Sequence, residues 1–150
     1  MPKFYEDLKV GDKFVTPRRT VTEADIVAFS GLSGDYNALH TDEVFASETQ
    51  FGGRIAHGPL GFVIATGLSN RTGLFDGSTL AFLEMKWKFT APIYPGDTVH
   101  LEMTVVEMRP TSKPDRGILV REMNLFNHKG QLVQTGLFTI MIKFRGAAAE

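Results

Sequence analysis

The segment from Pro59 to about Arg71 constrains the fold most, because it is apolar on almost every side. Proline suits the first turn of a helix, where its missing N–H would have no acceptor, and Gly73 follows as a stop signal. We therefore predict a buried helix over this segment. Gly61 and Gly67 cost roughly 1 kcal/mol each inside a helix, which indicates that another backbone packs closely against it.

From Ser78 onward the apolar residues recur with a period of two, which is typical of half-buried strands. The alternating apolar sets are Leu83, Met85, Trp87 and Phe89; Val99, Leu101, Met103 and Val105; and Phe138, Ile140, Ile142 and Phe144. Another strand is expected over Ile118–Phe126, and an earlier one over Lys13–Val21, where Pro17 favours a sheet edge. A sheet of about five antiparallel strands wrapped around one apolar helix would bury both, so the fold class is α+β.

Two shorter helices are expected before the apolar helix. Thr22 begins a capping box for the first, and Gly31 and Gly34 end it. Asp42, or the threonine before it, caps the second, which includes residues 43–46. The segment between these helices and the apolar helix is rich in glycine and polar residues.

The length of 150 residues favours a single domain over residues 1–150, with a lead-in arm at 1–10 and a disordered tail at 146–150. The net charge of −1, without runs of like charge, argues against nucleic acid or an anionic membrane as the main partner. The absence of cysteine excludes disulfides, thiolate catalysis and Cys-ligated zinc. No signal peptide or membrane-length apolar run is visible, so a cytoplasmic location is expected.

The densest polar chemistry lies in residues 33–60, which form a loop-rich segment. Its candidate side chains are Asp35, Asn37, His40, Asp42, Arg54 and His57. Loops on a rigid scaffold commonly carry binding and catalysis. We predict that Asp35 and His40 form an acid/base pair and that the free amides of the helix beginning at Gly58 form an oxyanion hole.

The ordered pattern Gly-Asp-Tyr-Asn-Ala-Leu-His-Thr-Asp at 34–42, with Phe-Gly-Gly-Arg-Ile-Ala-His-Gly-Pro-Leu at 51–60, resembles the MaoC-like dehydratase family, the (R)-specific enoyl-CoA hydratases. The resemblance implies a hot-dog fold and a homodimer, joined edge to edge, or a larger homo-oligomer. It also implies reversible syn hydration of a trans-2-enoyl thioester of CoA or acyl carrier protein, without a cofactor or metal ion. Asp35 and His40 match the family's catalytic pair, and Gly58 its oxyanion glycine.

Other loop residues receive supporting roles. Asn37 is expected to hold the loop and His57 to fix the turn before the helix, while Arg54 contacts either a CoA phosphate or a carboxylate. Two positions depart from the family pattern: Ala38 replaces the usual proline, and Val63 replaces a serine often found one turn into the central helix.

Two other functions stay open at this point. A hot-dog acyl-CoA thioesterase places an acidic residue on the central helix, and Pro59–Leu68 contains none. A non-catalytic acyl-thioester-binding subunit is compatible with the two departures from the family pattern. A metal site built from Asp35, His40, Asp42 and His57 is disfavoured, because their spacing matches no helical ligand pair.

Overall fold

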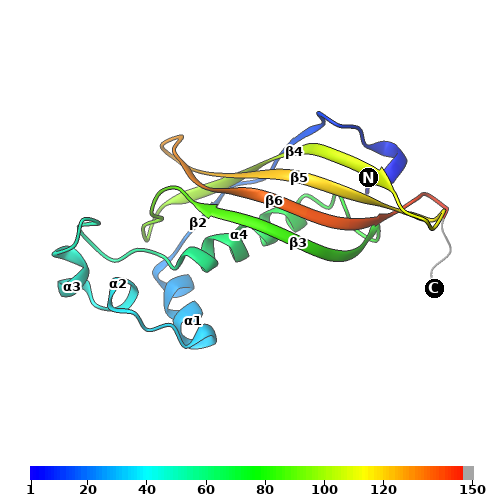
Figure 1. Ribbon diagram of the computed structural model, residues 1–150. Coiled ribbons are helices and arrows are strands. Elements are labelled where there is room, and N and C mark those ends of the chain that lie inside the picture. The colour runs from blue at the N-terminus through cyan, green and yellow to red at the C-terminus, as the bar shows by residue number, and fades with distance from the viewer. Residues whose placement is uncertain (147–150) are drawn as a thin grey trace.

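The computed structural model describes residues 1–146 (Figure 1). Of the expected tail, Gly146 lies in a turn and residues 147–150 fall outside the described part of the chain. None of the helices within residues 1–146 is both long and apolar enough to cross a lipid bilayer.

A curved antiparallel sheet dominates the fold (Figure 1). Its strands are β1 (Lys13–Val15), β2 (Arg19–Thr20), β3 (Thr79–Phe89), β4 (Thr98–Pro110), β5 (Arg116–Asn127) and β6 (Leu132–Lys143). The spatial order is β1-β4-β5-β6-β3, and β2 also pairs with β4. The predicted first strand is therefore two short strands, because the segment around Pro17 leaves the ladder. The predicted antiparallel sheet is confirmed, with six strands where about five were expected.

The helices before the central one are α1 (Glu23–Ser33), α2 (Ala38–Thr41) and α3 (Glu43–Ser47), and a 3₁₀ turn, η1 (Tyr5–Asp7), precedes the sheet. The capping box at Thr22 is confirmed, since its hydroxyl accepts from the Asp25 amide at 3.2 Å. Gly34 ends α1 with a φ of 76°, whereas Gly31 lies inside the helix, so its predicted role as a stop was wrong. Figure 1 shows α1–α3 gathered beyond one end of the sheet.

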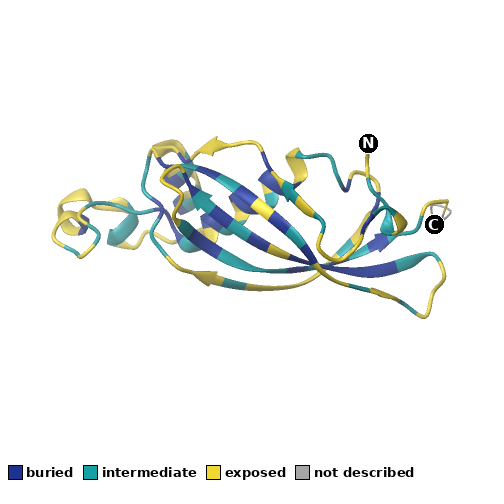
Figure 2. Ribbon diagram, turned by 90° about the horizontal axis from the view of Figure 1, so that it is seen from above, coloured by how far each residue is buried: buried dark blue, intermediate teal, exposed yellow. Residues whose placement is uncertain are grey.

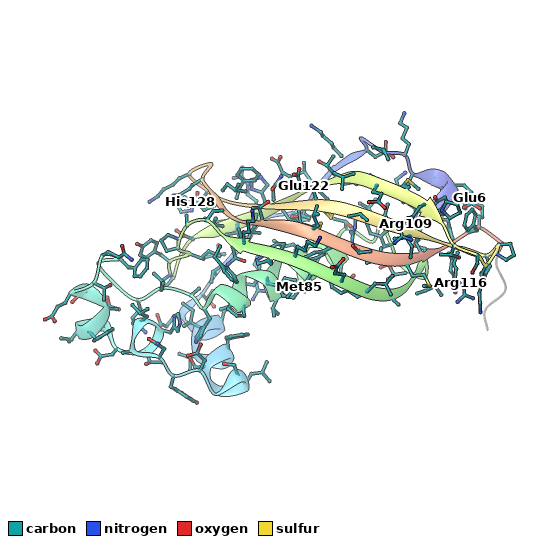
Figure 3. All side chains as sticks on the ribbon, viewed as in Figure 1. Glu6, Met85, Arg109, Arg116, Glu122 and His128 are labelled. Carbon is teal, nitrogen blue, oxygen red and sulfur yellow. The ribbon has the colours of Figure 1, made fainter. Side chains whose placement is uncertain are left out.

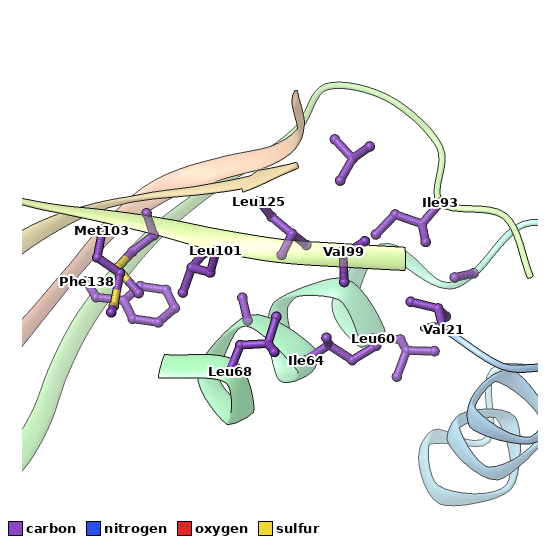
Figure 4. Packing of buried hydrophobic residues seen from close by; sticks show 14 of the residues in the cluster. Val21, Leu60, Ile64, Leu68, Ile93, Val99, Leu101, Met103, Leu125 and Phe138 are labelled. Atoms are coloured by element: carbon purple, nitrogen blue, oxygen red, sulfur yellow. The ribbon is translucent and has the colours of Figure 1, made fainter. Parts of the chain in front are cut away.

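Helix α4 (Gly58–Arg71) is the predicted apolar helix, and it packs on the inner face of the sheet. Figure 4 shows its inward side chains meeting those of β4, β5 and β6. The contacting core residues include Leu60, Ile64 and Leu68 on the helix and Leu101, Met103, Leu125 and Phe138 on the sheet. The alternation of buried and exposed residues along the strands is visible in Figure 2. The predicted close approach of another backbone was wrong: the neighbour at Gly61 is the Gln134 side chain of β6, and Gly67 has no neighbour within 4 Å.

Strand β3 differs from its predicted half-buried state. Leu83, Met85 and Phe89 are each about half exposed, at 47%, 48% and 59%. Strand β3 pairs only with β6 within residues 1–146 and forms an edge of the sheet. Periodicity cannot distinguish an inner strand from an edge strand, because both show the same alternation of side chains. Strand β3 is therefore an apolar strand with one unpaired backbone edge.

Candidate active site

The polar segment of residues 33–60 is shaped by two successive helix caps. The Asn37 side chain accepts from the Leu39 amide at 3.0 Å and begins α2, which carries His40. The Asp42 side chain accepts from the Phe45 amide at 3.0 Å and begins α3. Asp42 is thus an N-cap, as expected, while the short helix around His40 was not predicted.

His40 has a defined tautomer in this arrangement. Its Nδ1 lies 2.7 Å from the carbonyl oxygen of Ile55, and this oxygen can only accept. Nδ1 therefore carries the hydrogen, and Nε2 is left with a lone pair when the ring is neutral. A histidine held in this way presents one nitrogen for proton transfer.

His57 lies directly before α4 and is almost fully buried, with 1% of its surface exposed. Its Nε2 donates to the backbone oxygen of Asp35 at 3.0 Å and lies 3.2 Å from the Ser30 hydroxyl. The rings of His57 and His40 stack with centroids 3.8 Å apart. His57 therefore links α1, the Asp35 loop and the start of α4.

Burial lowers the pKa of His57 below its ordinary value, and the nearby His40 acts in the same direction. The unfolded chain then binds more protons than the folded chain between the lowered pKa and about 6.5, the ordinary histidine value. We expect the free energy of unfolding to fall as pH drops from about 7.5 to about 5. Urea unfolding at both pH values measures this slope. A His57→Gln variant should show a smaller dependence of unfolding free energy on pH. Replacement of the exposed His128 is the control and should leave the His57 contribution in place. An unchanged slope in His57→Gln would contradict the assignment.

The structure brings Asp35 and His40 together. Side-chain ligand atoms of Asp35, His40 and His57 all lie within 4.8 Å of one another. The Asp35 carboxylate accepts from the Asn37 amide at 3.1 Å, so the loop fixes its direction. A separation of this size suits one water molecule bridging a carboxylate and an imidazole. These three residues are also the one group of potential metal ligands found in residues 1–146.

His40 and Gly58 line the same cavity, whose volume is about 500 Å³. The other walls are Phe51, Ile55, Ala56, Pro59, Phe89, Thr90, Ala91, Pro92, Ile93 and Gln134, which are mostly apolar. Pro59 has no N–H, and the Leu60 and Gly61 amides donate to the His57 carbonyl, so the Gly58 N–H is the amide left free at the positive end of the helix dipole. A cavity with a proton-transfer group at one side and a free amide at another can bind and polarise a carbonyl.

Gly58 is closely approached by Phe89 of β3. A Cβ atom at this position would come within 2.8 Å of the Phe89 ring. The Gly58 carbonyl accepts from the Gln134 side chain at 3.0 Å, which fixes the start of α4 to β6. Glycine therefore keeps this end of the cavity open.

Arg54 binds carboxylates in this structure. Its Nε donates to Glu43 at 2.6 Å, and its terminal nitrogens bind Glu23, so it joins α3 to α1. The carboxylate contact predicted for Arg54 is therefore present.

Sequence reasoning missed three contributors to the site: Ser30, Phe89 and Gln134. Ser30 is only 2% exposed, although most other residues of α1 are not buried. Phe89 of β3 and Gln134 of β6 lie 29 and 74 positions after the end of the loop segment at residue 60. Only the small size of Gly61, which leaves room for Gln134, gave a local signal of this contact.

The fold, the cavity and the loop define a class of protein. Residues 7–122 match the family described as the MaoC like domain. The chain therefore belongs to the MaoC-like dehydratase family, and its hot-dog fold is confirmed. A Mycobacterium tuberculosis protein described as having a double hotdog fold shares this fold, with a TM-score of 0.83 at 22% identity over 99% of this chain and 46% of that chain.

Particular relatives are similar over nearly the whole chain. The (R)-specific enoyl-CoA hydratase of Rhodospirillum rubrum is 35% identical over 145 residues, which cover 95% of this chain and 94% of that protein. The crystal structure of a MaoC-like dehydratase from the same organism has a TM-score of 0.84 at 31% identity, covering 95% of this chain and 98% of that chain. Protein MaoC of Klebsiella aerogenes is 41% identical over 102 residues, 68% of this chain, and this chain spans only 30% of its length. Relatives named hydratase or dehydratase are hydro-lyases.

Proposed function

We propose that this protein is an (R)-specific hydratase that interconverts trans-2-enoyl thioesters and (R)-3-hydroxyacyl thioesters of CoA or acyl carrier protein. The observation that carries the proposal is the shared cavity of His40 and Gly58, with the Asp35 carboxylate within 4.8 Å of the imidazole. The 35% identity to an (R)-specific enoyl-CoA hydratase supports the same reaction.

In the proposed reaction, Asp35 and His40 hold one water molecule beside the β-carbon of the substrate. The water oxygen forms a bond to the β-carbon and loses one proton to the pair, and the α-carbon gains one proton from the pair. His40 can take part through Nε2, because Nδ1 is engaged with Ile55. Acid/base catalysis of this kind contributes about 10²- to 10⁴-fold to a rate.

The thioester oxygen carries negative charge while the enolate exists. We place this oxygen against the free Gly58 amide at the start of α4, where the helix dipole also favours negative charge. The lack of a side chain at Gly58 lets a thioester lie close to the backbone. The apolar cavity walls then receive the acyl chain.

The test is a hydration assay with crotonyl-CoA and a panel of longer and branched enoyl-CoA and enoyl carrier-protein thioesters. We expect loss of the conjugated-enone absorbance and formation of the (R)-3-hydroxy product on chiral analysis. No turnover of any member of the panel would overturn the proposal. Release of free thiol without hydration would instead indicate a thioesterase, although α4 carries no acidic residue to serve one.

We also propose that two copies pair through β3. This edge strand exposes Leu80, Phe82, Leu83, Met85 and Phe89, and Val63 of α4 is exposed as well. An unpaired apolar edge favours addition of another strand, and joining two β3 strands would bury these side chains. Sedimentation analysis should give the mass of a dimer or a multiple of it, and Met85→Lys should shift it toward the monomer. A monomeric wild-type protein would refute the pairing.

A further inference from the structure

Arg121 occupies an inward position on β5. It pairs with Val105 of β4 and Phe138 of β6, and its flanking inward neighbours Leu119 and Met123 are fully buried. Arg121 itself is only 4% exposed. Arginine is almost never buried to this degree unless a partner balances its charge.

No carboxylate balances this charge within residues 1–146. One terminal nitrogen of Arg121 donates to the Ser69 hydroxyl at 3.1 Å and lies 3.6 Å from the Met103 sulfur. The guanidinium carbon lies 4.4 Å from the centre of the Phe75 ring. The Nε–H has no hydrogen-bond acceptor. Burial lowers the pKa of Arg121 to about 10, so the side chain still carries its charge at neutral pH.

The guanidinium borders a second cavity, of about 260 Å³, beside the C-terminal half of α4. Its polar lining comes from Thr66, Ser69, Asn70, Thr79 and Arg121, and its apolar lining from Phe75, Phe82, Phe138 and Ile140. A single buried positive charge next to aromatic and aliphatic walls suits an anion of charge −1 that carries an apolar chain. Guanidinium groups match the planar geometry of carboxylates.

We propose that the Arg121 cavity binds the carboxylate of an organic acid with an apolar chain. The carboxylate accepts from the Arg121 guanidinium and supplies the missing counter-charge. Its chain lies against Phe82 and Phe138.

Two sources of the carboxylate fit this chemistry. One is a free fatty acid. The other is the distal carboxyl group of a dicarboxylic acyl thioester, and this source rests on the proposed hydratase function. Ser69 lies 11 positions after Gly58 along a helix that rises 1.5 Å per residue, so about 16 Å separates these two residues along α4. The acyl source therefore requires a long chain.

The direct test follows the ¹⁵N–¹H signal of the Arg121 Nε–H by NMR while sodium hexanoate is added to the intact protein. We expect a saturable shift of this signal. Hexanamide, and sodium chloride at the same ionic strength, should produce none. If hexanoate gives no saturable shift, the proposal is wrong. This measurement needs no catalytic turnover, so it stands or fails independently of the proposed function.

Variants test whether the guanidinium is responsible. Arg121→Met should abolish hexanoate binding, measured by calorimetry, and Arg121→Lys, which keeps the charge without the planar fork, should weaken it at least tenfold. Arg109→Met is the matched control, because Arg109 lies on the neighbouring strand β4, pairs with Glu107 and is exposed (Figure 3). Equal hexanoate affinity in Arg121→Lys and the wild type, or unchanged binding in Arg121→Met, would refute the role of Arg121.

Kinetics distinguish the two sources. The ratio of kcat/KM for a long ω-carboxy enoyl-CoA to that for the methyl-ended enoyl-CoA of the same length is measured in wild type and Arg121→Met. A ratio that falls at least tenfold in the variant assigns the cavity to the acyl chain of the substrate. An unchanged ratio, with hexanoate binding intact in the wild type, assigns it to a free fatty acid.

Discussion

Replacing His40 with alanine is expected to lower kcat for enoyl-CoA hydration by about 10²- to 10⁴-fold, the usual contribution of acid/base catalysis. The reason is geometric: Nδ1 of His40 is held by the Ile55 carbonyl at 2.7 Å, which leaves Nε2 for the reacting water. Initial rates at saturating crotonyl-CoA, or the best substrate of the panel, measure the effect. A cooperative unfolding transition in urea should show that the His40→Ala variant is folded.

The Asp35→Asn variant tests the other member of the pair with little change in shape. The amide oxygen can still accept from the Asn37 amide, so the loop keeps its conformation while the negative charge is lost. We expect a loss of kcat comparable to that of His40→Ala. The matched control is Asp42→Asn, because Asp42 caps α3 and is not in the group that Asp35 forms with His40 and His57. Full activity in Asp35→Asn would remove this carboxylate from the mechanism.

Substitution of Gly58 by alanine is expected to lower kcat/KM about 10²-fold, the size of effect that a misplacement of about 1 Å produces in a reacting group. The added methyl group would lie 2.8 Å from the Phe89 ring and protrude where the thioester is proposed to lie. The double variant Gly58→Ala with Phe89→Leu relieves the contact with the ring. If the methyl group itself displaces the thioester, the double variant stays slow, whereas full recovery would show that only the ring position mattered.

Gly67 provides the control for a Gly→Ala change in the same helix. Nothing lies within 4 Å of a Cβ atom at this position. Gly67→Ala should leave kcat/KM unchanged in the hydratase assay and raise the free energy of unfolding by about 0.5 to 1 kcal/mol, because alanine loses less backbone entropy in a helix. A slow Gly67→Ala variant would mean that helix rigidity, and not the room at Gly58, controls the rate.

The central helix, the capping box at Thr22 and the alternating strands were predictable because each depends on neighbouring residues. The approach of Asp35 to His40 was predictable because five positions separate them and a family resemblance covers the loop. The exposure of β3 was not predictable, since an edge strand and an inner strand carry the same alternation.

The burial of Arg121 could not be predicted from the sequence for a different reason. The facing of the strand around it was unsettled in the sequence, because Ile118, Leu119 and Val120 are consecutive apolar residues without alternation. Only its pairing with Phe138 on β6 places the arginine on the inner face of the sheet. Contacts between strands are set by tertiary structure. From the sequence alone, a charged residue is predicted to lie on the surface.

Gln134 connects the start of α4 to the sole tryptophan of the chain. Its amide nitrogen donates to the Gly58 carbonyl at 3.0 Å, and its amide oxygen accepts from the Trp87 indole at 2.9 Å. A thioester that enters beside Gly58 and Gln134 will disturb this indole hydrogen bond. Intrinsic fluorescence can therefore report ligand arrival and departure in real time, without a label and with a single emitter to interpret.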